Sequence, residues 1–141
     1  MENTSRENVI AKARATYVGN EPDYLSFKYK GTKCEIKRNP EMLFLCGYAS
    51  FRPCHCYDVA HYRNNLESID VHGGVTYFEV SPSGTITIGF DCAHINDLIP
   101  TFSIQAGEKE GEEYRTIGFV KKEIRRMVDQ IIKINDQLSG E

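Results

Sequence analysis

The sequence predicts an α+β fold, in which an antiparallel sheet of about five or six strands carries a long C-terminal helix on one face. Two patterns predict this fold. From position 24 onward, apolar and polar residues alternate in several short runs, which is typical of strands with one buried face. Near the C-terminus, apolar residues instead recur at three- and four-residue steps, which is typical of an amphipathic helix. The length of 141 residues suffices for one such domain.

The N-terminal residues are polar and weakly patterned, so we expect residues 1–22 to form a loosely attached extension and residues 23–141 a single α+β domain. A short helix is expected over residues 9–18, and the Gly19-Asn20-Glu21-Pro22 segment should end it. The N-terminus has no signal-peptide core, no apolar run is long enough for a membrane span, and the cysteines fit reduced thiols. The expected location is therefore the cytoplasm.

Five alternating or apolar runs predict the strands, and two turns join four of them into hairpins. Lys30-Gly31-Thr32 separates the first pair and Ser81-Pro82-Ser83-Gly84 the last pair. The predicted strands cover residues 24–30, 33–37, 42–48, 75–80 and 85–90. Further predicted elements are a strand-like run over 69–72, a short helix over 58–66, a charged loop over 105–113 and the long helix over 117–138.

Reactive side chains crowd into the middle third of the chain, where all four histidines lie between positions 55 and 94. The segments Asp70-Val71-His72-Gly73-Gly74 and Gly89-Phe90-Asp91-Cys92-Ala93-His94 each place an imidazole near a carboxylate after an apolar run. Gly73 and Gly74 allow a positive φ and the close approach of a ligand, although a tight turn explains them equally well. These segments predict a functional site.

Asp91, His94 and Asp97 are spaced three residues apart, so one helical turn would present them together. Such a trio could ligate a divalent metal, work in acid–base chemistry, or bind a ligand through hydrogen bonds. Alternatively, Asp91 caps a short helix and His94 is satisfied at a polar edge. The Cys54-His55-Cys56 segment favours zinc only weakly, because no second ligand pair stands at a zinc-binding spacing.

Composition excludes several classes of function. The net charge of −3 argues against a protein that holds extended nucleic acid. The chain has no Walker-type loop, no Rossmann fingerprint and no Gly-x-Ser-x-Gly motif. Aromatic residues are plentiful near the candidate site, and Tyr48 or Tyr77 could stack on a base or a sugar.

The order of these motifs resembles a family of small proteins encoded by bacteriophages and prophages, over roughly residues 25–138. The resemblance rests on Cys46-Gly47-Tyr48, His55, His72-Gly73-Gly74-Val75-Thr76-Tyr77, Gly89-Phe90-Asp91-Cys92-Ala93-His94 with Asp97, and Tyr114-Arg115. It implies a phage or mobile-element origin, and motif positions at His55, His72, Asp91, His94 and Asp97. This chain departs from the family at Thr87-Ile88, where tryptophans are frequent, and at Cys56, where proline is frequent.

The leading hypothesis is a phage-type protein, in the host cytoplasm, that binds a small polar ligand without a cofactor. By analogy with other small phage proteins, the ligand would be a nucleotide-derived signal, sequestered to counter host defence. Polar contacts are assigned to His55, His72, Gly73, Gly74, Asp91 and His94, and stacking to Tyr48 or Tyr77.

Two alternatives remain open. One is a metal-dependent hydrolase, with a divalent metal held by His72, Asp91, His94 and Asp97. The other is an inhibitor that binds a protein through the C-terminal helix, whose Lys121, Lys122, Arg125 and Arg126 otherwise form a solvated face. Neither extended nucleic acid nor a membrane is an expected partner, and self-association is a weaker expectation.

Overall fold

A computed structural model describes residues 2–54 and 59–139 of the chain. Within these residues, five strands form one antiparallel sheet in the order β1-β2-β3-β5-β4. The strands are β1 Tyr24–Tyr29, β2 Thr32–Arg38, β3 Leu45–Phe51, β4 Tyr77–Val80 and β5 Ile86–Asp91. The helices are α1 Glu2–Ala13, α2 Val59–Leu66, α3 Pro100–Ala106 and α4 Ile117–Ser139, with a π-helical turn over Arg14–Val18 after α1. The predicted α+β class is therefore confirmed.

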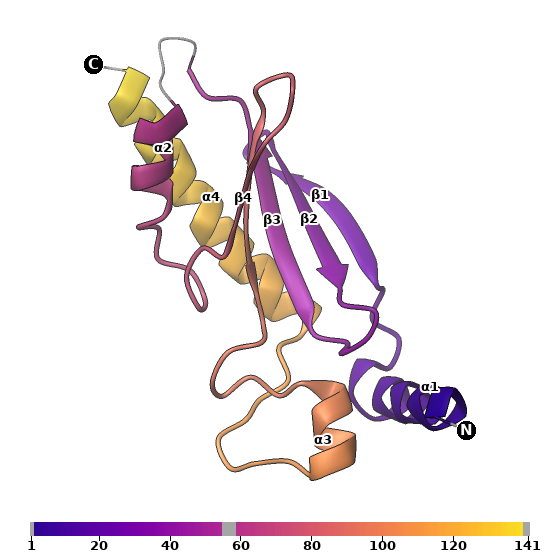
Figure 1. The fold of residues 1–141 in the computed structure, drawn as a ribbon. Coiled ribbons are helices and arrows are strands. Elements are labelled where there is room, and N and C mark those ends of the chain that lie inside the picture. The colour runs from indigo at the N-terminus through magenta and orange to yellow at the C-terminus, as the bar shows by residue number, and fades with distance from the viewer. Residues whose placement is uncertain (1, 55–58, 140–141) are drawn as a thin grey trace.

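Helix α4 crosses one face of the sheet, as predicted (Figure 1). Its apolar side chains pack against the inward-facing side chains of the strands in one core. The fit is close at Gly47 on β3, where an added Cβ would lie 2.7 Å from the Phe90 ring and 2.9 Å from Ile124. The buried apolar side chains of α4 are Val120, Ile124, Met127, Val128, Ile131 and Leu138.

The opposite face of the sheet, which we call the open face, carries polar and aromatic side chains. Because side chains alternate along a strand, the residues between the core positions point to this face. No helix among the described residues packs over it; α1 and α3 lie together at one end of the sheet, and α2 lies beside α4 (Figure 1). The open face includes Lys28, Lys33, Glu35, Lys37, Tyr48, Ser50, Tyr77, Glu79, Thr87 and Asp91.

The N-terminal segment is packed against the domain, in contrast to the loose attachment that its polar sequence predicted. Ala13 and Val18 are buried in a small second core with Leu43, against which Ile10 and Ile104 also pack. Arg6 donates a hydrogen bond to the Glu41 carbonyl at 2.9 Å. Only a few apolar contacts hold this helix, so its sequence contains few apolar residues and gave little sign that it packs against the domain. The boundary at residue 22 stays a prediction.

A buried arginine joins the N-terminal segment, the end of β2 and the start of α4. Arg38 donates hydrogen bonds to the Asp23 carboxylate at 3.0 Å, the Leu43 carbonyl at 2.9 Å and the Tyr114 hydroxyl at 2.7 Å. Glu21 in turn accepts hydrogen bonds from the Tyr114 hydroxyl at 2.6 Å and from the backbone N–H of Ile117 at 2.8 Å. Glu21 therefore caps the first turn of α4 from a distant part of the chain.

Three predicted strands differ from the structure, of which the fourth differs only in beginning at Tyr77 rather than residue 75. The third strand begins at Leu45 rather than residue 42, because the Asn39 side chain accepts from two backbone N–H groups in a turn and Leu43 has a φ of 72°. Residues 69–72 form no strand. Their backbone instead pairs with side chains of α4, Asp70 with Gln130 and His72 with Glu123.

Helix α3 was not predicted. It begins at Pro100, which suits the first turn of a helix, and it overlaps the start of the segment that was expected to be a charged loop. Its seven residues are too few for a clear helical period, which explains the miss. Among the described residues, no helix is both long and apolar enough to cross a bilayer.

Candidate ligand-binding site

The predicted site residues fall into two histidine–aspartate pairs and an aromatic pair on the open face. His72 pairs with Asp97, and His94 lies beside Asp91. The rings of His72 and His94 are 6.0 Å apart between centroids, so the two pairs are neighbours. His55 lies outside the described residues. The sequence therefore identified residues that meet in space, but not how they are paired.

In the His72–Asp97 pair the carboxylate is buried and fully hydrogen-bonded, and the imidazole is mostly buried. Nε2 of His72 lies 2.9 and 2.8 Å from the two carboxylate oxygens of Asp97, which places the ring proton on Nε2 because an ionised carboxylate only accepts. Arg115 donates from Nε to Asp97 at 2.7 Å, and the His94 backbone N–H donates at 3.0 Å. The Asp97 carboxylate is thus saturated by protein donors.

These donors decide the ionisation of Asp97. Burial alone would raise its pKa, but the hydrogen bonds from Arg115, His72 and the His94 backbone outweigh burial, so the pKa lies below the usual value of 3.8. The chain brings Arg115 to this position through a short bridge in which Leu98 donates to the Glu113 carbonyl at 2.9 Å. Asp97 therefore remains an anion at neutral pH and anchors the ring of His72.

The His94–Asp91 pair is more open and less completely bonded. Nε2 of His94 lies 3.1 Å from Asp91 Oδ1 without forming a hydrogen bond, and this buried nitrogen has no other hydrogen-bond partner among the described residues. Asp91 accepts instead from the Thr76 hydroxyl and the Ala93 backbone N–H, each at 3.1 Å. The imidazole of His94 is therefore less completely hydrogen-bonded than the Asp97 carboxylate.

Residues 91–97 do not form the single helical turn that their spacing predicted. Asp91 accepts from the backbone two residues on, and Asn96 has a φ of 71°, so the segment is a series of turns. The two aspartates therefore face different partners rather than sharing His94. Within residues 2–54 and 59–139, no group of three or more His, Cys, Asp or Glu side chains has a metal-binding arrangement. The divalent-metal alternative stays a prediction.

Gly73 is required by His94. Both Gly73 and Gly74 have a positive φ, 69° and 81°, as the sequence predicted. A Cβ on Gly73 would lie 2.2 Å from Cδ2 of His94, so the histidine ring occupies the space above this glycine. Gly73 therefore allows the His94 ring, rather than a ligand, to lie close to the backbone.

The aromatic pair lies on the open face next to these histidines. The rings of Tyr48 and Tyr77 meet edge to face, with centroids 5.3 Å apart, and Lys37 Nζ lies 5.3 Å from the Tyr48 centroid. Gly89 separates the two tyrosines on β5, and a Cβ there would lie 2.6 Å from Tyr48 Cδ1. Burial is the main cause that raises the pKa of Tyr48 to about 12, so its hydroxyl stays protonated.

A shallow cavity of about 380 Å³ opens beside the two tyrosines. Its walls combine two aromatic rings, one cation, two carboxylates and one hydroxyl, all from the open face. Its volume falls in the range of about 300–1,000 Å³ that is typical of small-molecule sites. The lining residues are Glu35, Lys37, Tyr48, Tyr77, Glu79 and Thr87.

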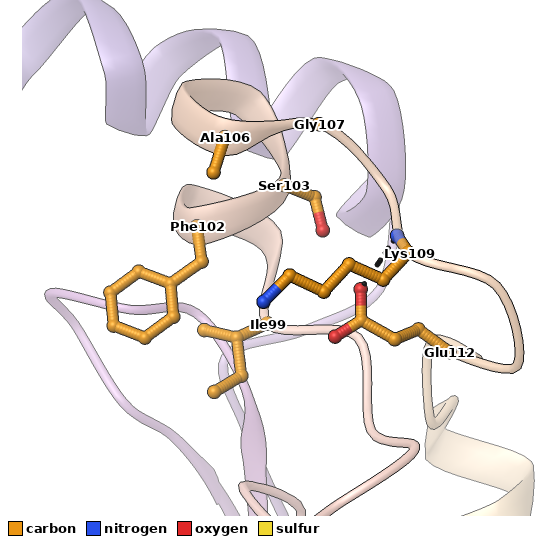
Figure 2. Close-up of a pocket in the computed structure, with 7 residues that line it drawn as sticks. All are labelled: Ile99, Phe102, Ser103, Ala106, Gly107, Lys109 and Glu112. Atoms are coloured by element: carbon orange, nitrogen blue, oxygen red, sulfur yellow. Dashed lines mark hydrogen bonds between the residues drawn. The ribbon is translucent and has the colours of Figure 1, made fainter.

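A second pocket lies away from the predicted site, between α3 and the loop that follows it (Figure 2). Its volume is about 140 Å³, well below the range of about 300–1,000 Å³ that is typical of small-molecule sites. Figure 2 shows the Lys109 side chain running towards Ile99, with the Glu112 side chain beside it. None of the residues predicted from the sequence lines this pocket, so it does not define the site.

Several residues of the site were not predicted from the sequence. Lys37 and Thr76 lie in ordinary alternating runs and carried no signal. Glu123 is buried on α4, accepts from the His72 backbone N–H at 2.9 Å and pairs with Arg126 at 2.8 Å. Its position within the apolar stripe of α4, one residue before Ile124, was a signal that a charged side chain there has a structural partner.

Comparison with family models, with curated proteins and with solved structures finds no match to this chain. The site therefore has to be interpreted from its own geometry. That geometry consists of an aromatic and charged cavity, a half-open His94–Asp91 pair beyond it at the end of β5, and a His72–Asp97–Arg115 group whose carboxylate is buried.

Proposed function

We propose that this protein binds a small polar ligand with a planar ring on the open face of its sheet. The observation that carries the proposal is the cavity of about 380 Å³ at Tyr48 and Tyr77. A binding site commonly pairs an apolar or aromatic surface with a few well-placed polar groups, and this cavity has both. Tyr48 supplies the main ring contact, because Gly89 beneath it and Tyr77 beside it fix its orientation.

The remaining side chains of the cavity suit a nucleotide-derived ligand. A base has a planar face for stacking on tyrosine. The carboxylates of Glu35 and Glu79 can accept hydrogen bonds from ribose hydroxyls or from exocyclic amino groups, and Lys37, whose Nζ lies over the Tyr48 ring, adds a cation beside the stacked base. Because the cavity is shallow and its charge is mixed, it suits one nucleotide rather than an extended strand.

The two histidine–aspartate pairs have different roles in this proposal. Asp91 lies two residues from Gly89 on the same face of β5, so the His94–Asp91 pair extends the polar surface beyond the cavity. The His94 side chain is about three-tenths exposed, so the accessible part of its ring can contact the ligand. His72, Asp97 and Arg115 act as positioning residues that support His94 from behind.

We further propose, from the resemblance to small phage proteins, that the ligand is a nucleotide signal of host defence and that the protein sequesters it in the host cytoplasm. Sequestration needs binding without turnover. The saturation of Asp97 by Arg115, His72 and the His94 backbone supports binding over hydrolysis, because it leaves no ready general base on that carboxylate.

Calorimetric titration of the four ribonucleosides and their monophosphates into the purified protein tests the proposal. Tyr48→Ala should weaken binding roughly 10- to 100-fold, since stacking on an aromatic side chain contributes about 1–3 kcal/mol per base. Tyr17→Ala, a tyrosine on the π-helical turn, is the matched control and should leave binding unchanged. Absence of binding by every compound at millimolar concentration, with a folded protein, would contradict the proposal.

A further inference from the structure

We infer that Lys28 and Lys33 form a phosphate-binding site on the open face. The inference rests on the proposed function, because it assigns the phosphate group of a ligand whose ring contacts Tyr48. The two lysines stand directly opposite each other on β1 and β2. Both are exposed, and neither has an ion-pair partner among the described residues.

The pairing of these lysines is unfavourable for the fold itself. Side chains directly opposite on antiparallel strands have Cβ atoms about 4.5–5.5 Å apart, and like charges at that separation repel. The neighbouring lysines are compensated differently: Lys30 forms an ion pair with Asp129 at 2.8 Å, and Lys37 lies over the Tyr48 ring. The carboxylate of Glu35, two residues from Lys33 on the same face of β2, forms no ion pair with either lysine and accepts from the Tyr24 hydroxyl instead. The Lys28–Lys33 pair is therefore a concentration of positive charge that an anionic ligand would neutralise.

Protection of a sheet edge does not explain the pair. Lysines are frequent on edge strands, where they discourage pairing with other chains, and β1 is an edge strand. Edge protection explains the presence of Lys28 on β1. Lys33 lies on β2, which is paired on both sides, and therefore needs another explanation. Binding of an anion accounts for both lysines at once.

The distance from the lysine pair to the aromatic pair fits one nucleotide. Tyr48 is directly opposite Glu35, so Lys33 is its diagonal neighbour, at about 7–8 Å in an antiparallel sheet. A base stacked on Tyr48 can therefore place its own phosphate at Lys33 and Lys28.

The neighbours of Lys33 in the same row of the sheet also suit a phosphate. Ser50 is directly opposite Lys33, and its hydroxyl lies 2.7 Å from the Thr87 hydroxyl, so both can donate towards phosphate oxygens. The same row across the sheet ends at Glu79 on β4. Glu79 is three strand spacings from Lys33, or about 14 Å at the usual spacing. Repulsion of the phosphate by Glu79 is therefore weak.

The test combines two probes, pyrophosphate and a nucleoside with its monophosphate, on the full chain. Amide chemical shifts are followed while inorganic pyrophosphate is added; the backbone signals of Lys28, Lys33 and Ser50 should move. In parallel, the affinity for the best-binding nucleoside and for its monophosphate is measured in wild type, in the double variant Lys28→Gln with Lys33→Gln, and in Lys122→Gln. Lys122 is an exposed lysine on α4 and serves as the matched control.

The expected result is that the monophosphate binds about 10-fold more tightly than the nucleoside, and that the double variant abolishes this difference. The nucleoside affinity should stay the same in the double variant, and Lys122→Gln should behave as wild type. If the nucleoside binds but phosphate adds nothing and pyrophosphate moves no signal at Lys28 or Lys33, the inference is overturned while the proposed function stands. Failure of the nucleoside alone, with pyrophosphate seen at these lysines, would instead remove the ring site and retain the phosphate site.

Discussion

The two histidine–aspartate pairs of this protein contain the same chemical groups in opposite environments. In the His72–Asp97 pair the carboxylate is buried and accepts from an arginine, a histidine and a backbone N–H. In the His94–Asp91 pair both side chains are about three-tenths exposed, and the ring nitrogen that faces Asp91 has no hydrogen bond within the part of the chain that the structure describes. The first pair is therefore suited to holding structure and the second to meeting a ligand.

The largest expected effect comes from removing the buried carboxylate. Asp97→Ala would leave Arg115 and the His72 ring without their partner in a buried site, a change that typically costs about 3–5 kcal/mol. The free energy of unfolding in urea measures this. Asp91→Ala, at the open pair, is the matched variant and should cost less than about 1 kcal/mol. Equal losses in the two variants would contradict the distinction between the pairs.

Acid should destabilise the protein through the same carboxylate. The pKa of Asp97 in the folded protein lies below its ordinary value of 3.8, because hydrogen bonds from Arg115 and His72 outweigh burial. Its ionised form is favoured by folding, so its contribution is fully present above about pH 4 and is lost as pH falls through the folded pKa. Urea unfolding from pH 6 to pH 2.5 should show a loss that is smaller in Asp97→Asn. An unchanged pH dependence in that variant would show that other carboxylates cause the acid response.

A glycine substitution should disturb the contact between the two pairs. Gly73→Ala puts a methyl group 2.2 Å from Cδ2 of His94 and places alanine at a φ of 69°, which costs about 1–2 kcal/mol for the backbone alone. The ring of His94 must move, so its imidazole signals should shift strongly in the NMR spectrum. Gly74→Ala has similar backbone strain but open space around the new methyl group, and should leave those signals in place.

The smallest effect on stability is expected at the open pair. His94→Ala removes packing above Gly73 but also removes a buried nitrogen without a partner, and these contributions oppose each other. The free energy of unfolding should change by less than about 1 kcal/mol. Binding of a nucleoside monophosphate should weaken roughly 5-fold, the scale of one lost hydrogen bond. A loss of stability as large as that of Asp97→Ala, with unchanged binding, would reverse the two roles.

The regular part of this fold could be predicted from the sequence because it follows repeating patterns. Alternation identified both hairpins, and the apolar stripe identified α4 from Ile117 onward. The N-terminal helix was predicted too short and too loosely attached, because a few small residues such as Ala13 make its contacts. Helix α3, at seven residues, was too short to show a period.

For the site, the sequence predicted which residues cluster but not how they pair. The sequence indicated His72, Gly73, Asp91, His94 and Asp97 as one cluster, and they do lie together. It could not give their pairing, because a spacing of three implies a shared face only in a helix, and residues 91–97 are turns. Arg115 and Glu123, which bind Asp97 and the His72 backbone, come from distant parts of the chain. Their contacts depend on how α4 and the loop before it pack against the sheet. Such tertiary contacts leave little trace in local patterns.

Titration of amide chemical shifts with the four ribonucleoside monophosphates tests the central claim, a ring-binding site on the open face, most directly. At least one compound should shift the signals of Tyr48, Tyr77 and Gly89, with smaller changes at His94 and none in α3. Shifts confined to α3 and the pocket at Phe102, or none at millimolar concentration, would contradict it.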